Sequence, residues 1–248
     1  MSGHSKWHSI KHKKGAADAK RGKIFTKHAK LISIAARNGD DPNMNPGLRS
    51  AIINAKADNV PNANIEKAVK KGSGQDKDAA QYVEMIYEGY GPAGTAMLVE
   101  VITDNKNRSV ASIKTIVTKN GGHMGEAGSV GWMFDRKGLI IAKADGKNPD
   151  EAELEVIDAG AEDLAIDGGE YEIITADTDL MSVRDNLEKI GFKIEKAEIS
   201  YIPKTTVKID DIDKAKTVLR LMDLLDEDED VSNIFSNFDI AEDIMEQM

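Results

Sequence analysis

Residues 139–202, LIIAKADGKNPDEAELEVIDAGAEDLAIDGGEYEIITADTDLMSVRDNLEKIGFKIEKAEISYI, decide the fold of this chain. Their hydrophobic patterns follow the order strand, helix, strand, strand, helix, strand. This order is the split arrangement of a ferredoxin-like domain, in which the helices cover one face of an antiparallel sheet. The segments are 139–143, 150–159, a strand near Leu164, 171–175, 180–190 and 194–202. We expect the domain to occupy residues 135–203.

The segments on either side are each too short to form a domain alone. Before the ferredoxin-like domain we predict strands over 82–89 and 95–103, a helix over 106–120, a strand VGWMF over 130–134 and a turn over 135–138. After it we predict a strand over 206–209, a helix over 212–225, a strand over 231–235 and a short amphipathic tail. We therefore predict that 76–134 and 204–248 form one discontinuous α+β domain, into which the ferredoxin-like domain is inserted.

The residue pattern over the first 75 positions predicts three helices. The second begins with Asn45 as its cap and Pro46 at its first position, and the third is capped by Asn62 or Asn64. With the basic arm before them, we expect these helices to form a domain over 1–75. The predicted fold class is therefore α+β, with an N-terminal three-helix domain and two α/β sandwich domains, one of them ferredoxin-like and inserted into the other.

The charge of the chain is divided unevenly along its length. The first 38 residues hold ten Lys or Arg, a single acid, Asp18, and four of the five histidines, so they carry about +9. The whole chain carries −10, which leaves about −19 on the remaining 210 residues. An acidic body repels polyanions while a basic arm attracts them. The asymmetry indicates a nucleic-acid partner that is contacted through the N-terminus.

The candidate contacts lie mainly in this arm and on the first helix. On a helical wheel, five basic residues form a stripe roughly opposite the apolar face: Lys20, Lys23, Lys27, Lys30 and Arg37. Lysines neutralise phosphates, and Trp7 can stack on an unpaired base. The predicted nucleic-acid-binding residues are Lys6, Trp7, Lys11, Lys13, Lys14, Lys20, Arg21, Lys23, Lys27, Lys30, Lys106 and Arg108.

The histidines have two interpretations each. His4, His8 and His12 are spaced to share one helix face and bind a transition metal, but the surrounding lysines favour a basic tail that binds polyanions. His28 lies on the apolar side of its helix, so we interpret it as a packing residue rather than a ligand or a base.

A glycine-rich run, GGHMGEAGSVG over 121–131, resembles a phosphate-binding loop only in composition. Phosphate-binding loops follow a strand and open a helix, whereas this run follows a helix and opens a strand. We interpret it as a helix end with tight turns. The alternative is that its backbone amides or His123 touch RNA or a partner.

Two charged segments need an explanation. Asp104 or Asn105 can cap the helix over 106–120, but Arg108 in its first turn opposes the helix dipole, so we expect a contact to phosphate or to another domain. The acidic run DEDED over 226–230 lacks the glycine and the distal glutamate of an EF-hand loop. We expect a solvated helix end, with electrostatic contact to the basic arm as the alternative.

The composition narrows the class of protein. There are no cysteines, which excludes disulfides and thiolate chemistry. The apolar runs are too short to span a bilayer, and the N-terminus lacks the apolar core of a secretory signal. No serine has a plausible base beside it in sequence, and the carboxylates show no recognisable pairing. We expect a cytoplasmic, non-enzymatic and monomeric protein with no cofactor, no metal, no membrane and no small-molecule substrate.

Five motifs carry a family resemblance that runs essentially from end to end. They are MSGHSKWHSIKHKKGAADAKRGKIFTKHAKLI (1–32), NPGLRSAIINAKADNVPNANIEKAVKKG (45–72), YEGYGPAG (87–94), TDNKNRS (103–109) and GGHMGEAGSVGWMFDRKG (121–138). Together they resemble the YebC/PmpR family, whose mitochondrial relatives are translational activators of a cytochrome oxidase subunit. The departures are Asp40, where a second glycine is common, and TDNKNRS where TDNRNRT is common.

The resemblance implies a three-domain α+β protein and a nucleic-acid partner, without chemistry. Members are usually labelled probable transcriptional regulators, and others are implicated in translation on the ribosome. Lysine-rich contacts are blind to sequence, and no helix shows the Asn, Gln and Arg pattern of a major-groove reader, so the residues favour structured RNA over an operator. The alternatives are a protein-interaction module that works through the acidic body and, more distantly, an enzyme in a cleft between domains.

Overall fold

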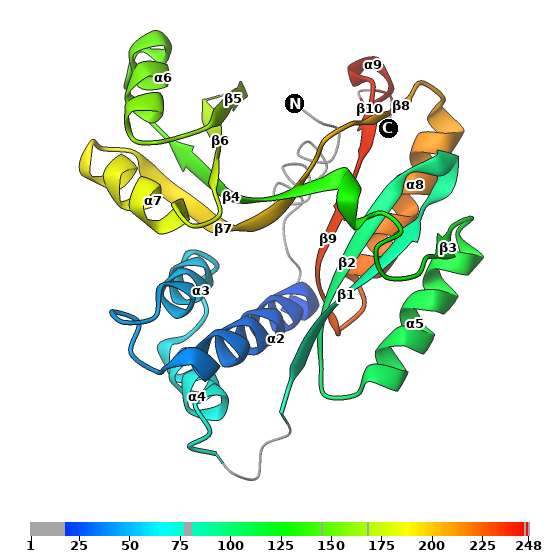
Figure 1. Cartoon of the computed structure of the whole chain (residues 1–248), viewed down its shortest axis with the longest axis horizontal. Coiled ribbons are helices and arrows are strands. Elements are labelled where there is room, and N and C mark those ends of the chain that lie inside the picture. The colour runs from blue at the N-terminus through cyan, green and yellow to red at the C-terminus, as the bar shows by residue number, and fades with distance from the viewer. Residues whose placement is uncertain (1–17, 77–80, 145, 168, 246, 248) are drawn as a thin grey trace. The chain divides into compact units, whose positions relative to one another are not determined.

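The computed structural model describes residues 18–76, 81–144, 146–167, 169–245 and 247 (Figure 1). Within them the chain combines helices with three sheets, so the predicted α+β fold class is confirmed. The residues group into two compact units. The first holds the described parts of Met1–Ile34, Asp78–Asp135 and Pro203–Met248, and the second those of Ala35–Lys77 and Arg136–Ile202. The domain borders expected at 75, 134 and 203 stay a prediction.

The first unit contains a four-stranded sheet in the order β3-β1-β2-β9. β2 (Ala96–Thr103) is central, and both of its alternating sets of side chains are largely buried. It pairs antiparallel with β1 (Val83–Tyr90) on one side and with β9 (Val231–Ser236) on the other. The two-residue strand β3 (His123–Met124) extends the sheet beyond β1. The sheet is therefore completed by a strand from near the end of the chain.

Two helices share the core of this sheet. α5 (Lys106–Lys119) and α8 (Ile212–Asp226) pack on each other, and their apolar residues meet those of β2 and β9. The fully buried Ile113 and Leu221 belong to this core. The unit also contains α2 (Asp18–Ala35), the parallel pair β8 (Val207–Ile209) and β10 (Phe238–Ile240), and α9 (Glu242–Met245).

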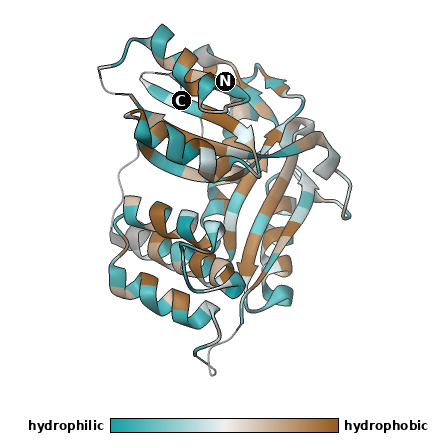
Figure 2. Cartoon of the chain, turned by 60° about the vertical axis from the view of Figure 1, so that its left-hand side comes forward, coloured by the Kyte–Doolittle hydropathy of each residue, from teal (hydrophilic) through white to brown (hydrophobic). Residues whose placement is uncertain are grey.

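The second unit contains the ferredoxin-like arrangement. Its sheet has the order β5-β6-β4-β7, with β6 antiparallel to both β4 and β5. Two helices share one apolar core with the sheet (Figure 2), in which Ile140, Val156 and Leu187 are fully buried. In chain order the elements are β4 (Phe134–Lys143), α6 (Pro149–Asp158), β5 (Asp163–Asp167), β6 (Glu170–Ala176), α7 (Leu180–Lys189) and β7 (Lys193–Pro203).

Two further helices belong to the second unit, α3 (Pro46–Ala57) and α4 (Asn62–Gly72), and a 3-10 turn, η1 (Ala36–Asn38), precedes them. Asn45 caps α3 as expected, because its side-chain oxygen accepts the N–H of Leu48 at 3.0 Å. The expected cap of α4 by Asn62 or Asn64 is wrong, since the helix begins at Asn62 and Pro61 precedes it without a side-chain cap. Ser50 and Asn54 on α3 donate to the carbonyl of Ala197 in β7.

The segment before the ferredoxin-like elements differs from the expectation. Residues 131–133 form a 3-10 turn, η3 (Gly131–Met133), instead of the strand expected over 130–134, because the N–H groups of Val130 and Gly131 are taken by a carboxylate rather than by a neighbouring strand. The turn expected over 135–138 is also absent, since β4 runs through it. Gly138 is needed there for close packing: a Cβ atom would collide with the Thr175 hydroxyl on β6.

Candidate nucleic-acid interface

The predicted contacts of the N-terminal arm lie outside the described residues. They are Lys6, Trp7, Lys11, Lys13 and Lys14, and the three histidines with metal-ligand spacing, His4, His8 and His12, lie outside the described residues as well. The described residues begin with α2, and this helix contains all the other predicted contacts except Lys106 and Arg108. Lys20 and Arg21 lie in the first turns of this helix, and the described side chains of the basic stripe start with Lys23.

The lysines of α2 differ in their exposure to solvent and in their contacts. Lys23 is exposed, and its ammonium donates to the backbone carbonyl of Glu227 at 2.8 Å. Lys27 is partly buried and has a partner. Lys30 is almost fully buried: its ammonium donates to the carbonyl of Glu229 at 2.6 Å and lies 5.8 Å from the ring centre of Tyr82. The stripe is therefore not a uniform solvent-facing surface.

Asp230 is the centre of the contacts that Lys30 makes. Its side chain is only 6% exposed and accepts the Lys30 ammonium at 2.9 Å. The guanidinium of Arg108 donates to the same carboxylate through Nε at 3.1 Å and Nη2 at 2.8 Å, and the hydroxyl of Ser109 donates at 2.8 Å. We call these four residues, Lys30, Arg108, Ser109 and Asp230, the Asp230 clasp. It joins α2, the start of α5 and the loop after α8 within the first unit.

The clasp holds its carboxylate ionised. Burial alone would raise the pKa of Asp230, but the hydrogen bonds from Lys30, Arg108 and Ser109, with the charge of Lys30, outweigh it and lower this pKa to about 2. Asp230 therefore keeps a full negative charge over the physiological range, opposite two cations.

The clasp bears on two expectations, those for the acidic run and for Arg108. The acidic run over 226–230 is not simply a solvated helix end, since Glu227 and Glu229 are exposed but Asp230 is buried. Two lysines of α2, Lys23 and Lys30, contact this run, whereas the alternative of a contact with the basic arm before α2 lies outside the described residues. Arg108 contacts a carboxylate of its own unit rather than another domain, and it also pairs with Asp104 at 2.9 Å, which explains a cation in the first turn of α5.

The remaining predicted positions are placed more simply. Lys106 is the first residue of α5 and is exposed, while Asn105 caps the helix by accepting the N–H of Arg108 at 3.1 Å. His28 is buried, with 8% of its surface exposed, which agrees with a packing role.

The glycine-rich run is organised by a residue that the sequence did not single out. The carboxylate of Glu88 on β1 accepts the N–H groups of Gly128, Val130 and Gly131, each at 2.7 Å. Burial opposes its ionised form, but the three backbone hydrogen bonds prevail and lower the pKa of Glu88. A hint was present in the sequence, since Glu88 lies within the YEGYGPAG motif. We call residues 125–132 the Glu88 loop.

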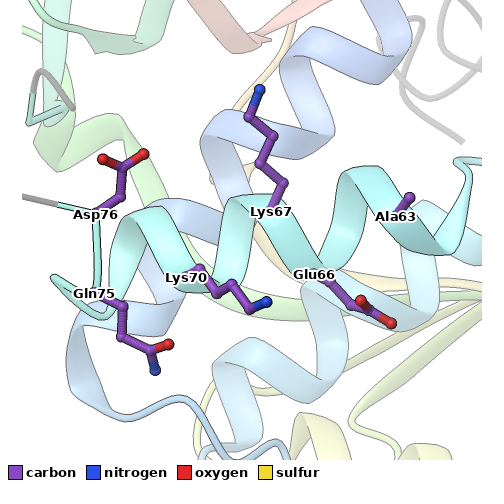
Figure 3. Close-up of a pocket in the computed structure, with 6 residues that line it drawn as sticks. All are labelled: Ala63, Glu66, Lys67, Lys70, Gln75 and Asp76. Atoms are coloured by element: carbon purple, nitrogen blue, oxygen red, sulfur yellow. The ribbon is translucent and has the colours of Figure 1, made fainter. Parts of the chain in front are cut away.

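A shallow depression lies on α4 in the second unit, with a volume of about 530 Å³. Figure 3 shows that Glu66 and Lys70 project from one side of α4 and Lys67 from the other. The other lining residues are Ala63, Gln75 and Asp76. A depression lined mainly by charged and amide groups differs from the largely apolar pockets that bind small molecules.

Two features of the described residues bear on metal and membrane binding. In the part of the chain that the structure describes, no three His, Asp or Glu side chains come together in a way that could hold a metal ion. None of the described helices is both long and apolar enough to cross a lipid bilayer.

Family models and individual relatives both show similarity to one protein family along most of the chain. Two family models match, described as the TACO1/YebC protein N-terminal domain (residues 5–75) and the TACO1/YebC second and third domain (residues 82–238). The chain is 51% identical to a probable transcriptional regulatory protein of Geobacter sulfurreducens and 49% identical to one of Fusobacterium nucleatum, each covering 100% of both chains.

A solved structure is also similar. The crystal structure of a conserved hypothetical protein from Aquifex aeolicus matches with a TM-score of 0.85 and 42% identity, covering 91% of this chain and 93% of that one. Sequence motifs, fold and full-length similarity agree, so the chain belongs to the TACO1/YebC family, the YebC/PmpR family of the sequence resemblance.

Proposed function

We propose that this protein is a non-enzymatic, nucleic-acid-binding regulator of gene expression that docks through its basic N-terminal arm and the first turns of α2. The observation that carries the proposal is the separation of charge, about +9 on the first 38 residues and about −19 on the other 210. A body of that charge repels a polyanion, so binding has to be local to the arm. The relatives' name, probable transcriptional regulatory protein, supports a regulatory role.

Two ion pairs lead us to propose a smaller set of nucleic-acid contacts. Lys30 has a side chain that is only 10% exposed and is bonded to Asp230, and the guanidinium of Arg108 is bonded to the same carboxylate. We assign both to the clasp and leave them out of the proposed interface. The proposed contacts are Lys6, Trp7, Lys11, Lys13, Lys14, Lys20, Arg21, Lys23, Lys27 and Lys106.

The clasp gives the arm a fixed attachment. Because Lys30 is bonded in the first unit, the helix that follows the arm is held by a buried ion pair. A tethered basic segment has a raised local concentration at any phosphate that the body already approaches. The arm supplies affinity, and the clasp determines where on the body that affinity acts.

Structured RNA, and the ribosome in particular, is the favoured target over operator DNA. Lysine contacts to phosphate carry no sequence information. Lys23 and Lys30 of α2 contact the acidic loop over 227–230 rather than standing free as a major-groove reading face requires. A translation factor working in the cytoplasm as a monomer is thus our first proposal, and a DNA-binding transcriptional regulator is the alternative.

A charge-reversal experiment tests the arm. In the full chain, Lys6, Lys11, Lys13 and Lys14 are changed to Glu, and the affinity for labelled ribosomal RNA hairpins is followed by fluorescence anisotropy across a series of salt concentrations. The matched control changes four exposed body lysines to Glu: Lys189, Lys193, Lys208 and Lys216. We expect the arm variant to lose binding, with the salt slope smaller by about 3, and the control to keep most of it. Unchanged affinity in the arm variant would contradict the proposal.

One observation favours a second candidate, a protein-interaction module. On α6, Leu154 and Ile157 are 65% and 54% exposed and lie on the outward side of the helix. The same helix carries five acids and no base: Asp150, Glu151, Glu153, Glu155 and Asp158. An apolar pair among acids fits a basic protein partner. Partner binding that survives deletion of residues 1–20 would favour this candidate.

A further inference from the structure

A short turn of the first unit presents an exposed tryptophan. Trp132 lies in η3, and 67% of its surface is exposed. Tryptophan is highly buried on average, and its burial contributes strongly to packing. The apolar side chain of Val130, two positions earlier in the chain, is by contrast fully buried. The residue before the turn, Val130, is therefore packed in the protein interior, while the indole ring of Trp132 faces solvent.

The loop that carries Trp132 is held by several hydrogen bonds. The Glu88 carboxylate holds three loop N–H groups, and the carbonyl of Glu88 accepts the N–H of Gly125 at 2.8 Å. A Cβ atom on Gly122 would approach the Tyr90 carbonyl to 2.5 Å, so this glycine permits a close backbone contact. Fixing a loop in this way removes much of the entropy that a flexible contact would lose on binding.

Two aromatic side chains donate hydrogen bonds to one carbonyl, and a third aromatic ring stacks on one of them. The indole Nε1 of Trp132 and the hydroxyl of Tyr90 both donate to the carbonyl of Ser129, at 3.1 and 3.2 Å. The exposed imidazole of His123 stacks on the Tyr90 ring with 5.1 Å between ring centres and an angle of 22°. We call Tyr90, His123 and Trp132 the aromatic cluster. The bond from Nε1 fixes the orientation of the Trp132 ring.

A cation lies next to the cluster. The ammonium of Lys204 donates to the backbone carbonyl of Trp132 at 3.1 Å, and its backbone N–H donates to the carbonyl of Met133 at 2.9 Å. Its side chain is 48% exposed and also pairs with Asp135 at 3.2 Å. The groups around the indole are thus aromatic, hydrogen-bonding and, through Lys204 and its partner Asp135, charged, whereas the centre of a protein-binding hot spot is a dry, closely packed pocket.

We propose that the aromatic cluster is a stacking site for an unpaired base of single-stranded RNA, with Trp132 as the stacking ring and Lys204 as the phosphate contact. Aromatic side chains beside cations are the common means of holding unpaired bases without regard to sequence. The inference rests on the proposed function, because it needs a nucleic-acid partner. It adds a second contact on the body, where the overall charge is unfavourable and stacking does not depend on charge.

The two tryptophans of the chain allow a direct optical test. Changing Trp7 to Phe leaves Trp132 as the only tryptophan of the full-length protein. Unpaired oligoadenylate is added, and indole fluorescence is recorded together with the anisotropy of a label on the RNA, which reports binding independently of Trp132. An RNA duplex of the same length is the comparison. We expect quenching of Trp132 by the single strand and little quenching by the duplex.

Three substitutions at one position separate stacking from other contacts. We expect Trp132→Ala to weaken single-strand binding by about 5- to 100-fold, Trp132→Phe to keep most of it, and Trp132→Leu to behave like Trp132→Ala, since leucine keeps apolar volume but has no π face. Glu88→Gln is a positioning variant: the anisotropy of Trp132 fluorescence should fall, because the loop loosens, and single-strand affinity should fall with it.

The outcomes distinguish the two proposals. Binding by label anisotropy without quenching, or with Trp132→Ala at wild-type affinity, overturns the stacking site and leaves the proposed function intact. Wild-type binding by Trp132→Leu overturns it in favour of an aliphatic contact of the kind proteins make. No binding of any RNA or DNA overturns the proposed function and the stacking site together.

Discussion

Lys30 and Asp230 are 200 residues apart in the sequence, and their charged ends lie 2.9 Å apart in the first unit, where both side chains are at most 10% exposed. The pair joins the helix that carries the basic stripe to the loop that carries the longest acidic run. Two segments that are far apart in the sequence are thus held together by one ion pair. Arg108 and Ser109 donate hydrogen bonds to the same Asp230 carboxylate.

Removing the charge of Asp230 should destabilise the protein. In Asp230→Asn the ammonium of Lys30 stays buried without its counter-charge, which costs about 3 kcal/mol in the free energy of unfolding. Urea unfolding followed by circular dichroism measures it. Glu229→Gln is the matched control, because it removes a charge from an exposed side chain of the same loop and should change stability by less than about 0.5 kcal/mol. Equal effects of the two variants would contradict a structural role for the clasp.

The clasp also predicts a pH dependence. The pKa of Asp230 is about 2 in the folded protein against an ordinary value of 3.8. Because the folded-state pKa is the lower one, the stabilisation is complete above about pH 4 and is lost as the pH falls toward 2. With allowance for screening on the exposed side of Arg108, the stability difference between wild type and Asp230→Asn should shrink by about 1–2 kcal/mol over that range. A difference that does not change between pH 5 and 2 would be inconsistent with the lowered pKa.

Lys30 and Lys23 should respond differently to the same change. Lys30→Met removes the buried cation from Asp230, although Arg108 still pairs with this carboxylate, and we expect a loss of about 2 kcal/mol. Lys23→Met removes an exposed ammonium that bonds a carbonyl, and we expect less than about 0.5 kcal/mol. Thermal unfolding of both variants makes the comparison, and the reverse order would contradict the assignment of Lys30 to the clasp.

Two glycines should give opposite results when changed to alanine. At Gly138 an added Cβ meets the Thr175 hydroxyl and comes within 3.0 Å of Leu180 Cβ, so Gly138→Ala should cost about 1–3 kcal/mol. At Gly22, inside α2, an added Cβ has no neighbour within 4 Å, so Gly22→Ala should stabilise the helix by about 0.5–1 kcal/mol. Denaturant unfolding decides, and a neutral Gly138→Ala would show that β4 and β6 can separate without loss.

Glu88 should control the exchange of loop amides. We expect Glu88→Gln to speed hydrogen exchange at Gly128, Val130 and Gly131, since a neutral amide offers one acceptor oxygen where the carboxylate offers two and a charge. Amides of β2 serve as the internal control and should not change. Unaltered exchange at the three loop amides would mean that the loop is held by other contacts.

Much of the fold could be predicted from the sequence because its signals are local. The cap of α3 by Asn45 and the order of elements in the ferredoxin-like unit depend on residues close together in the chain. The pattern over 130–138 predicts a strand and a turn that the structure does not have, because this segment depends on distant groups: Glu88 accepts hydrogen bonds from the loop amides, and Thr175 requires glycine at 138. Gly138 looks like a turn former in the sequence, although its role is close packing.

The candidate site was less predictable for the same reason. A helical wheel places Lys30 on the cationic side of α2, but it cannot show that this side meets an acidic loop about 200 residues away. Arg108 was recognised as unexplained by capping, but its partner lies 122 residues further on. The sequence pattern predicts a strand at Trp132, whereas the exposure of this residue and its aromatic neighbours depend on the tertiary fold.

The measurement that most directly tests the central claim is crosslinking of the tagged full-length protein to nucleic acid in growing cells, followed by sequencing of both the RNA and the DNA from one sample. We expect ribosomal RNA to dominate the crosslinks and charge reversal of the arm lysines to remove them. Discrete peaks at promoter DNA without ribosomal RNA would contradict it and establish a DNA-binding transcriptional regulator instead.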